Sequence, residues 1–123
     1  LVPVVINLLR CGQEAKLVVG DRIRDYLHVE DVASAVCAVA HSQLTGAVNI
    51  GSGVRVTVRD IALKIGELLG RVDLIKLVAL PDSPTEPMHL LADNTRLREG
   101  TGWKPRYDLD SGLRQTIEWW KDH

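Results

Sequence analysis

The chain has 123 residues, the length of one small domain or of part of one. A hydrophobic fraction of 46% and a charged fraction of 25% are typical of a globular protein, and the core must be aliphatic because there is no Phe and only three Trp and two Tyr. The net charge of −1 and the lack of any apolar run near the roughly 18 residues of a membrane span give no basis for nucleic acid or a membrane as a partner.

The first half of the sequence alternates helix and strand signals. In chain order it predicts a helix at 3–12, a strand at 16–20, a half-buried strand at 22–29, a helix at 30–42 and a strand ending in a glycine turn at 47–53. Pro3 suits the first turn of the first helix, and Gly12 follows its end. The helix at 30–42 is expected to gather apolar side chains on one face, namely Val32, Val36, Val39 and Ala40.

The second half continues the alternation. It predicts a helix at 57–70, a strand at 73–81, a loop at 82–87, a short helix at 92–102 and a final helix at 108–123. Thr57 and Asp60 have the spacing of a capping box, and Gly70 ends that helix. Asp93 or Asn94 is expected to cap the short helix, and the final helix has an apolar side formed by Leu109, Leu113, Ile117 and Trp120. The fold class is therefore α/β, with short strands and about five helices.

The cysteines and histidines predict no disulfide and no metal site. Cys11 and Cys37 each lie in an apolar helical pattern, so we expect buried free thiols in the reducing environment of the cytoplasm. The four histidines lack metal-ligand spacing. The apolar first segment has neither a basic start nor a small-residue cleavage site, so it does not resemble a signal peptide. Since the chain opens without Met, we expect processing or a piece of something longer.

Arg24 is the one position at which the residues alone indicate binding chemistry. The "GSG" at 51–53 follows a predicted strand but lacks the third glycine of a dinucleotide fingerprint, and no nucleophile motif is present. Strand alternation puts Arg24 on one face with Tyr26 and His28, and its planar fork of donors suits phosphate. The alternative is an ordinary ion pair on a solvated strand face.

A set of short motifs then occurs in a characteristic order along the chain. These are "VVG…IRDYLHVEDVA", "GAVNIGSG", "TVRDIA", "EPMHLLAD", "TGWKP" and "GLRQTIEWW". Together they resemble the C-terminal part of the extended short-chain dehydrogenases/reductases, the NAD(P)-dependent epimerases, dehydratases and reductases that act on nucleotide sugars. The resemblance implies that residues 1–123 form a single partial domain, the substrate-binding lobe, without the N-terminal Rossmann portion.

The resemblance also implies roles for particular residues. The arginine of "RDY", here Arg24, reaches the diphosphate of the nucleotide sugar, and the asparagine of "NIGSG", Asn49, contacts the nucleotide. Leu17 and Val19 line the base pocket, although many relatives have an aromatic residue where Val19 stands. A second phosphate-binding arginine comes three residues before an acid. Here the acid is Glu86 and the arginine position holds Ser83, a departure that weakens the expected affinity.

The resemblance assigns no catalytic residue to this chain. In the family, catalysis uses a Tyr-x-x-x-Lys pair, and the cofactor binds a glycine-rich turn of the Rossmann fold. Here the residue four positions after Tyr26 is Glu30, and the residue four positions after Tyr107 is Ser111. We therefore expect the nucleotide-sugar-binding part of an NAD(P)-dependent epimerase, dehydratase or reductase, which alone binds no NAD or NADP and is not catalytic. The alternatives are a stand-alone, non-catalytic module that binds a nucleotide sugar or a protein, and an unrelated small α/β domain.

The same resemblance implies uncovered apolar surface. In family members the helix at 30–42 and the strand at 47–53 pack against the cofactor lobe. A helix that is apolar on more than one face expects a partner on more than one side. We therefore expect a homo-oligomer, a dimer or larger.

Overall fold

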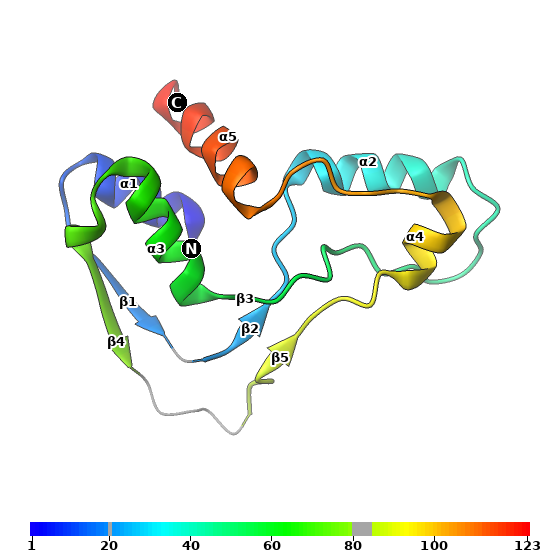
Figure 1. Ribbon diagram of the computed structural model, residues 1–123, viewed down its shortest axis with the longest axis horizontal. Coiled ribbons are helices and arrows are strands. Elements are labelled where there is room, and N and C mark those ends of the chain that lie inside the picture. The colour runs from blue at the N-terminus through cyan, green and yellow to red at the C-terminus, as the bar shows by residue number, and fades with distance from the viewer. Residues whose placement is uncertain (20, 80–84) are drawn as a thin grey trace.

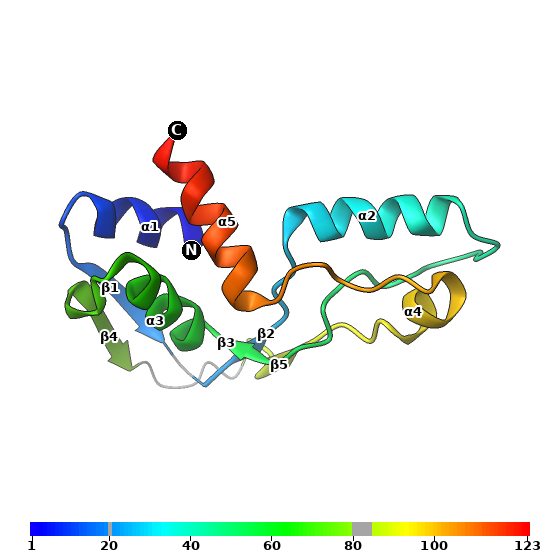
Figure 2. The ribbon, with the colours of Figure 1, turned by 45° about the horizontal axis from the view of Figure 1, so that its top comes forward.

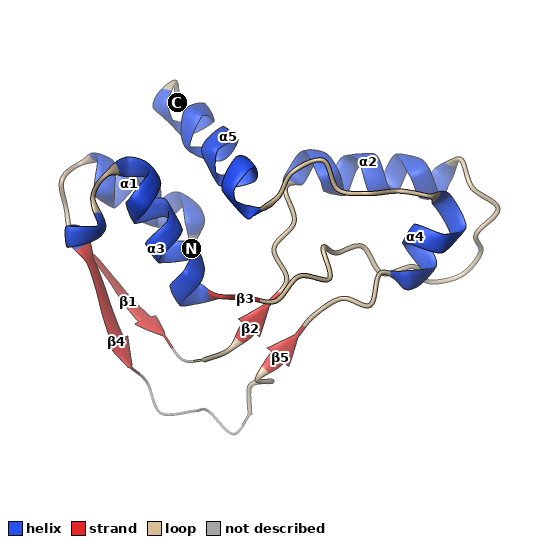
Figure 3. Ribbon diagram, in the orientation of Figure 1, coloured by secondary structure: helices blue, strands red, loops and turns tan. Residues whose placement is uncertain are grey.

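The computed structural model describes residues 1–19, 21–79 and 85–123, and the elements below are those of the described part. Five α-helices are present: α1 (Val2–Arg10), α2 (Val29–Ala40), α3 (Val58–Leu69), α4 (Thr95–Thr101) and α5 (Leu109–Lys121). Five short strands accompany them: β1 (Ala15–Val19), β2 (Ile23–Arg24), β3 (Val56–Thr57), β4 (Ile75–Ala79) and β5 (His89–Leu90), with a 3-10 turn at Val72–Leu74 (Figures 1 and 3). The predicted α/β class, the five helices and the short mixed strands are confirmed.

The strands form two small sheets in the described part. β1 pairs in parallel with β4, and Leu17 lies opposite Leu77. β2 is the centre of the second sheet, antiparallel to β3 and parallel to β5, so Arg24 lies opposite both Val56 and Leu90. The second sheet thus gathers three segments that are far apart in the sequence around Arg24.

The larger hydrophobic cluster lies where α1, α3 and α5 pack with β1 and β4 (Figure 1). Its innermost side chains are Val5, Ile6, Leu9, Ile61 and Ile65, all at most 1% exposed. The predicted capping box is present at the start of α3, with Asp60 N donating to Thr57 Oγ1 over 3.1 Å and Thr57 N donating to Asp60 Oδ2 over 2.9 Å. Gly70 ends α3 in the left-handed conformation, as predicted.

A smaller cluster joins α2 to α4 at the other end of the molecule (Figures 1 and 2). Its buried members are Ala35, Leu97 and Trp103. Between the clusters, the carboxylate of Asp31 is 2% exposed and accepts hydrogen bonds from Arg106 N and Tyr107 N, each over 2.9 Å. This carboxylate ties the start of α2 to the segment that leads into α5.

Three sequence-based expectations about local structure are wrong. The predicted strand at 47–53 is an irregular segment with no described strand beside it, and the carbonyl of Ala47 at its start accepts from Arg96. The predicted strand at 22–29 shortens to β2, since its continuation turns to begin α2.

The predicted burial of Cys11 and Cys37 is also wrong, because both are exposed. Cys11 follows the last turn of α1, and Cys37 lies on the side of α2 away from Ala35. The expected apolar face of α2 is divided as well. Val39 packs against the smaller cluster, whereas Val32 and Val36 are exposed.

Candidate functional site

Two arginines and one glutamate form a charged cluster beside β2. The Nη2 of Arg24 donates to Glu86 Oε1 over 2.6 Å, and the Nη1 of Arg22 donates to Glu86 Oε2. Arg24 is also fixed by its Nη1, which donates to Ile23 O over 2.9 Å and to Pro87 O over 3.2 Å. The arginine side chains are 20% exposed and that of Glu86 is 48% exposed. The cluster is therefore half-buried, with the acid outermost.

Arg22 is the member of this cluster that the family pattern does not single out. The signal was present, because Arg22 and Arg24 are two residues apart and a strand places such residues on one face. Of the two residues that the family pattern places in the substrate-binding loop, Glu86 lies in the cluster, whereas Ser83 lies outside the described residues. The structure thus brings Arg24 and Glu86 together and adds Arg22.

Asp25, which directly follows β2, holds the "GSG" turn in place. Its carboxylate accepts hydrogen bonds from Ser52 N at 2.7 Å, Ser52 Oγ at 2.8 Å, Gly53 N at 2.9 Å and Ala92 N at 3.2 Å. Burial alone would raise the pKa of Asp25, but the hydrogen bonds outweigh it and lower that pKa below its ordinary value. The carboxylate is therefore ionised near neutral pH.

The turn at 51–53 does not fit the pyrophosphate of a dinucleotide cofactor. Such a site needs free backbone N–H groups at the start of a helix. Here the N–H groups of Ser52 and Gly53 already point to Asp25, and α3 begins only after the cap at Thr57. A Cβ placed on Gly51 would lie 2.4 Å from that of Ala92, so this glycine serves close packing. We derive no cofactor contact from this turn.

The remaining predicted site residues lie in different surroundings. Asn49 is exposed, and its Nδ2 donates to Asp93 O over 3.3 Å, so it lies beside the segment that follows β5. Val19 at the end of β1 is 3% exposed, and Leu17 packs against the larger cluster. Leu17 and Val19 thus contribute to the interior of the first sheet.

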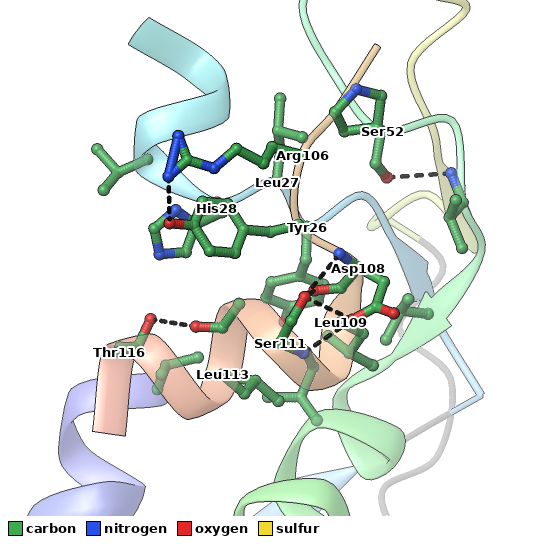
Figure 4. Close-up of a pocket in the computed structure, with 18 of the residues that line it drawn as sticks. Tyr26, Leu27, His28, Ser52, Arg106, Asp108, Leu109, Ser111, Leu113 and Thr116 are labelled. Atoms are coloured by element: carbon green, nitrogen blue, oxygen red, sulfur yellow. Dashed lines mark hydrogen bonds between the residues drawn. The ribbon is translucent and has the colours of Figure 1, made fainter. Parts of the chain in front are cut away.

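A cavity of about 640 Å³ lies between the loop before α2 and the first turns of α5 (Figure 4). Its wall is mostly apolar and includes Leu27, Leu109 and Leu113. At its edge His28 Nε2 lies 2.8 Å from the side-chain oxygen of Gln115. None of the five predicted site residues that the structure describes lines this cavity. Sequence reasoning missed it because its wall combines segments about 80 residues apart in the chain.

Two tyrosines of the cavity are held in the protonated form. The hydroxyl of Tyr107 donates to Glu30 Oε2 over 2.9 Å, and this hydrogen bond together with burial raises the pKa of Tyr107. Burial raises the pKa of Tyr26, partly offset by the charge of Arg24. Neither tyrosine is followed four residues later by a lysine, the spacing of the family's Tyr-x-x-x-Lys pair.

The described part of the chain has neither a candidate metal site nor a membrane-spanning helix. Residues 1–19, 21–79 and 85–123 contain no group of three His, Cys, Asp or Glu side chains placed to hold a metal ion. Within the same ranges, no helix has the length and apolar character needed to cross a bilayer.

The fold matches solved structures of short-chain dehydrogenase/reductase type. All of this chain aligns with 39% of dTDP-glucose 4,6-dehydratase from Bacillus anthracis, a structure in complex with NAD, at 28% identity and a TM-score of 0.84. Of this chain, 98% aligns with 39% of UDP-glucose 4-epimerase from Thermotoga maritima, a structure with UDP-glucose, at 27% identity and a TM-score of 0.85. The class is that of the extended short-chain dehydrogenases/reductases.

Sequence comparison defines the family within that class. The family model described as GDP-mannose 4,6 dehydratase matches residues 1–116. A putative GDP-L-fucose synthase 2 of Arabidopsis thaliana is 37% identical over 106 residues, which are 85% of this chain and 31% of the relative. The chain belongs to the family of NAD-dependent nucleotide-sugar epimerases and dehydratases. It spans about a third of the length of the relatives that it matches.

Proposed function

We propose that this chain, as a single partial domain of residues 1–123, is the nucleotide-sugar-binding part of a cytoplasmic NAD(P)-dependent epimerase, dehydratase or reductase. The observation that supports this most is the position of Arg24 on the central strand of the second sheet, where two backbone carbonyls and Glu86 fix its guanidinium. The ordered motifs of the family surround it. In this proposal Arg24 binds the diphosphate, and NAD or NADP binds a Rossmann part that this chain lacks.

The proposed part binds its substrate but does not carry out the reaction. An arginine retains its charge at every relevant pH and offers a rigid fork of donors, so it can hold a diphosphate without proton exchange. Tyr107 is engaged with Glu30, and Tyr26 has no lysine partner, which leaves no acid–base pair of the family's type. Asn49 would approach the nucleotide from the side of β5, and Leu17 and Val19 would support the base pocket from within.

Binding of nucleoside diphosphates to the isolated chain tests this proposal. Isothermal titration with UDP, GDP and dTDP should detect weak binding, and Arg24→Ala should weaken it about ten-fold or more, since a charge-assisted contact contributes about 1.5–3 kcal/mol. Arg114→Ala is the matched control, because Arg114 forms an ion pair with Asp110 on the exposed surface of α5. Equal affinity for the Arg24→Ala variant and the unaltered chain would contradict the assigned role.

A second candidate is a stand-alone, non-catalytic module that binds a nucleotide sugar or another protein. The exposed valines of α2, Val29, Val32 and Val36, favour it, because such apolar surface is typical of an interface. Reading the coding region upstream of Leu1 separates the two candidates. A glycine-rich turn and a Tyr-x-x-x-Lys pair in frame would support the enzyme part, and a stop codon in place of both would support the module.

A further inference from the structure

Glu86 forms an ion pair with both arginines of the candidate site. Its Oε1 accepts from Arg24 and its Oε2 from Arg22. We infer that Arg22 and Arg24 together form the anion-binding site, and that the carboxylate of Glu86 occupies it until a diphosphate displaces it. This inference rests on the proposed function and deepens it. It assigns a second phosphate-binding arginine, and it assigns Glu86 as a carboxylate that competes with the diphosphate. The family pattern instead has that arginine at the Ser83 position.

Arg22 has hydrogen-bonding capacity that the described part of the chain does not use. Its Nε is buried, and no acceptor lies within hydrogen-bond distance in that part. A buried donor without a partner is unfavourable, and a planar guanidinium binds phosphate best through two parallel N–H groups. A phosphate that takes the place of the Glu86 carboxylate would supply acceptors for both the Nε and an Nη of Arg22. Arg22 would then exchange its contact with the Glu86 carboxylate for a bidentate contact with the phosphate.

The charges of the cluster also favour an added anion. Two guanidinium groups and one carboxylate leave one positive charge in excess. Asp25 is not a member of this cluster, because its carboxylate accepts hydrogen bonds from Ser52, Gly53 and Ala92. A diphosphate carries more charge than a carboxylate and more acceptor oxygens, so it can replace both contacts of Glu86 at once.

The three side chains differ in how firmly they are held, which indicates which one moves. Arg24 is fixed by Ile23 O and Pro87 O, and both arginines are only 20% exposed. Glu86 is 48% exposed and is held by its ion pairs with the two arginines. Displacement therefore turns Glu86 outward to solvent and leaves Arg24 in place. The bridging glutamate keeps the two arginines close together when no anion is bound.

Four variants and two probes test this inference. Glu86→Gln removes the competing charge, Arg22→Ala removes the second guanidinium, and Arg22→Lys keeps the charge but removes the fork. Asp73→Asn is the matched control, because it makes the same change of charge at the exposed ion pair with Arg71. Each folded variant, checked by circular dichroism, is titrated with inorganic pyrophosphate and with UDP at low ionic strength, where such contacts are least screened.

Removing the acid and removing the arginine should change the binding affinity in opposite directions. Glu86→Gln should bind both probes at least about three-fold more tightly, and Arg22→Ala about ten-fold more weakly. Arg22→Lys should fall between Arg22→Ala and the unaltered chain, and Asp73→Asn should change nothing. Weaker or unchanged binding in Glu86→Gln would overturn the inference, as would unchanged binding in both Arg22 variants.

The two probes separate this inference from the proposed function. If UDP binding depends on Arg24 but not on Arg22 or Glu86, the proposed function stands and the inference fails. If pyrophosphate follows the expected pattern but UDP binds no more tightly than pyrophosphate, the two-arginine anion site stands and the nucleotide site fails. Absence of binding by either probe to every variant would overturn both.

Discussion

Replacing Asp25 with alanine should destabilise the chain and loosen the contacts that hold the strand of Arg24 in place. The carboxylate accepts four hydrogen bonds, which join β2 to the turn at 51–53 and to Ala92 beyond β5. A hydrogen bond to a charged group contributes about 1.5–3 kcal/mol, but four bonds to one partly exposed carboxylate are not additive. We therefore expect the free energy of unfolding to fall by about 2–4 kcal/mol, well below the simple total of four such bonds. Urea denaturation followed by tryptophan fluorescence measures it.

The pH dependence of this loss gives a second test. The pKa of Asp25 is lowered in the folded chain from the ordinary value of 3.8, so the folded state binds its proton less readily than the unfolded state does. The contribution of Asp25 is then complete above about pH 5 and is lost as the pH falls through the folded pKa. The difference between Asp25→Ala and the unaltered chain should shrink toward pH 3. A difference that is equal at pH 3 and pH 7, or that is below about 0.5 kcal/mol at pH 7, would refute the reasoning.

Three further predictions concern the junction, the cofactor and assembly. Asp31→Ala should lower the free energy of unfolding by about 2–4 kcal/mol, because it leaves two partly buried N–H groups, those of Arg106 and Tyr107, without their acceptor; thermal denaturation measures it. The isolated chain should bind NAD⁺, NADH and NADPH no more tightly than roughly 10 μM, about 7 kcal/mol, in isothermal titration, because the N–H groups of the turn at 51–53 are engaged by Asp25. In analytical ultracentrifugation at micromolar concentration the chain should be a dimer or larger, and Val36→Glu should shift it toward monomer; a stable monomer that takes up no hydrophobic dye would contradict this.

The helices could be predicted from the sequence because their signals are local. The Thr57–Asp60 capping box and Gly70 define α3 within a few residues, and the structure reproduces both ends. The apolar side of α5 was predicted on periodicity alone, and its four members lie in or against the larger cluster. Such features depend on neighbours three or four positions away, which the sequence displays directly.

The strands and the members of the site could be predicted only in part, because they depend on distant residues. Periodicity identified the segment that contains Arg24, but not the pairing of β2 with β3 and β5. The contact of Arg22 with Glu86 spans 64 positions, and no local pattern reveals it. The segment at 47–53 has the composition of a strand. The guanidinium of Arg96, however, donates to the carbonyls of Thr45 and Ala47, and no described strand lies beside the segment to complete a ladder of hydrogen bonds.

The helix α2 shows the same limit in the burial of its side chains. It carries two apolar faces: Ala35 packs against α4 and Trp103, while Val32 and Val36 remain in solvent. Helical periodicity shows that both faces are apolar, but it cannot show which one the chain itself covers. The covered face is the one that includes Asp31, because the carboxylate needs the N–H groups of Arg106 and Tyr107 to offset its burial. One buried acid therefore fixes the rotation of α2, and the valine face is exposed as a consequence.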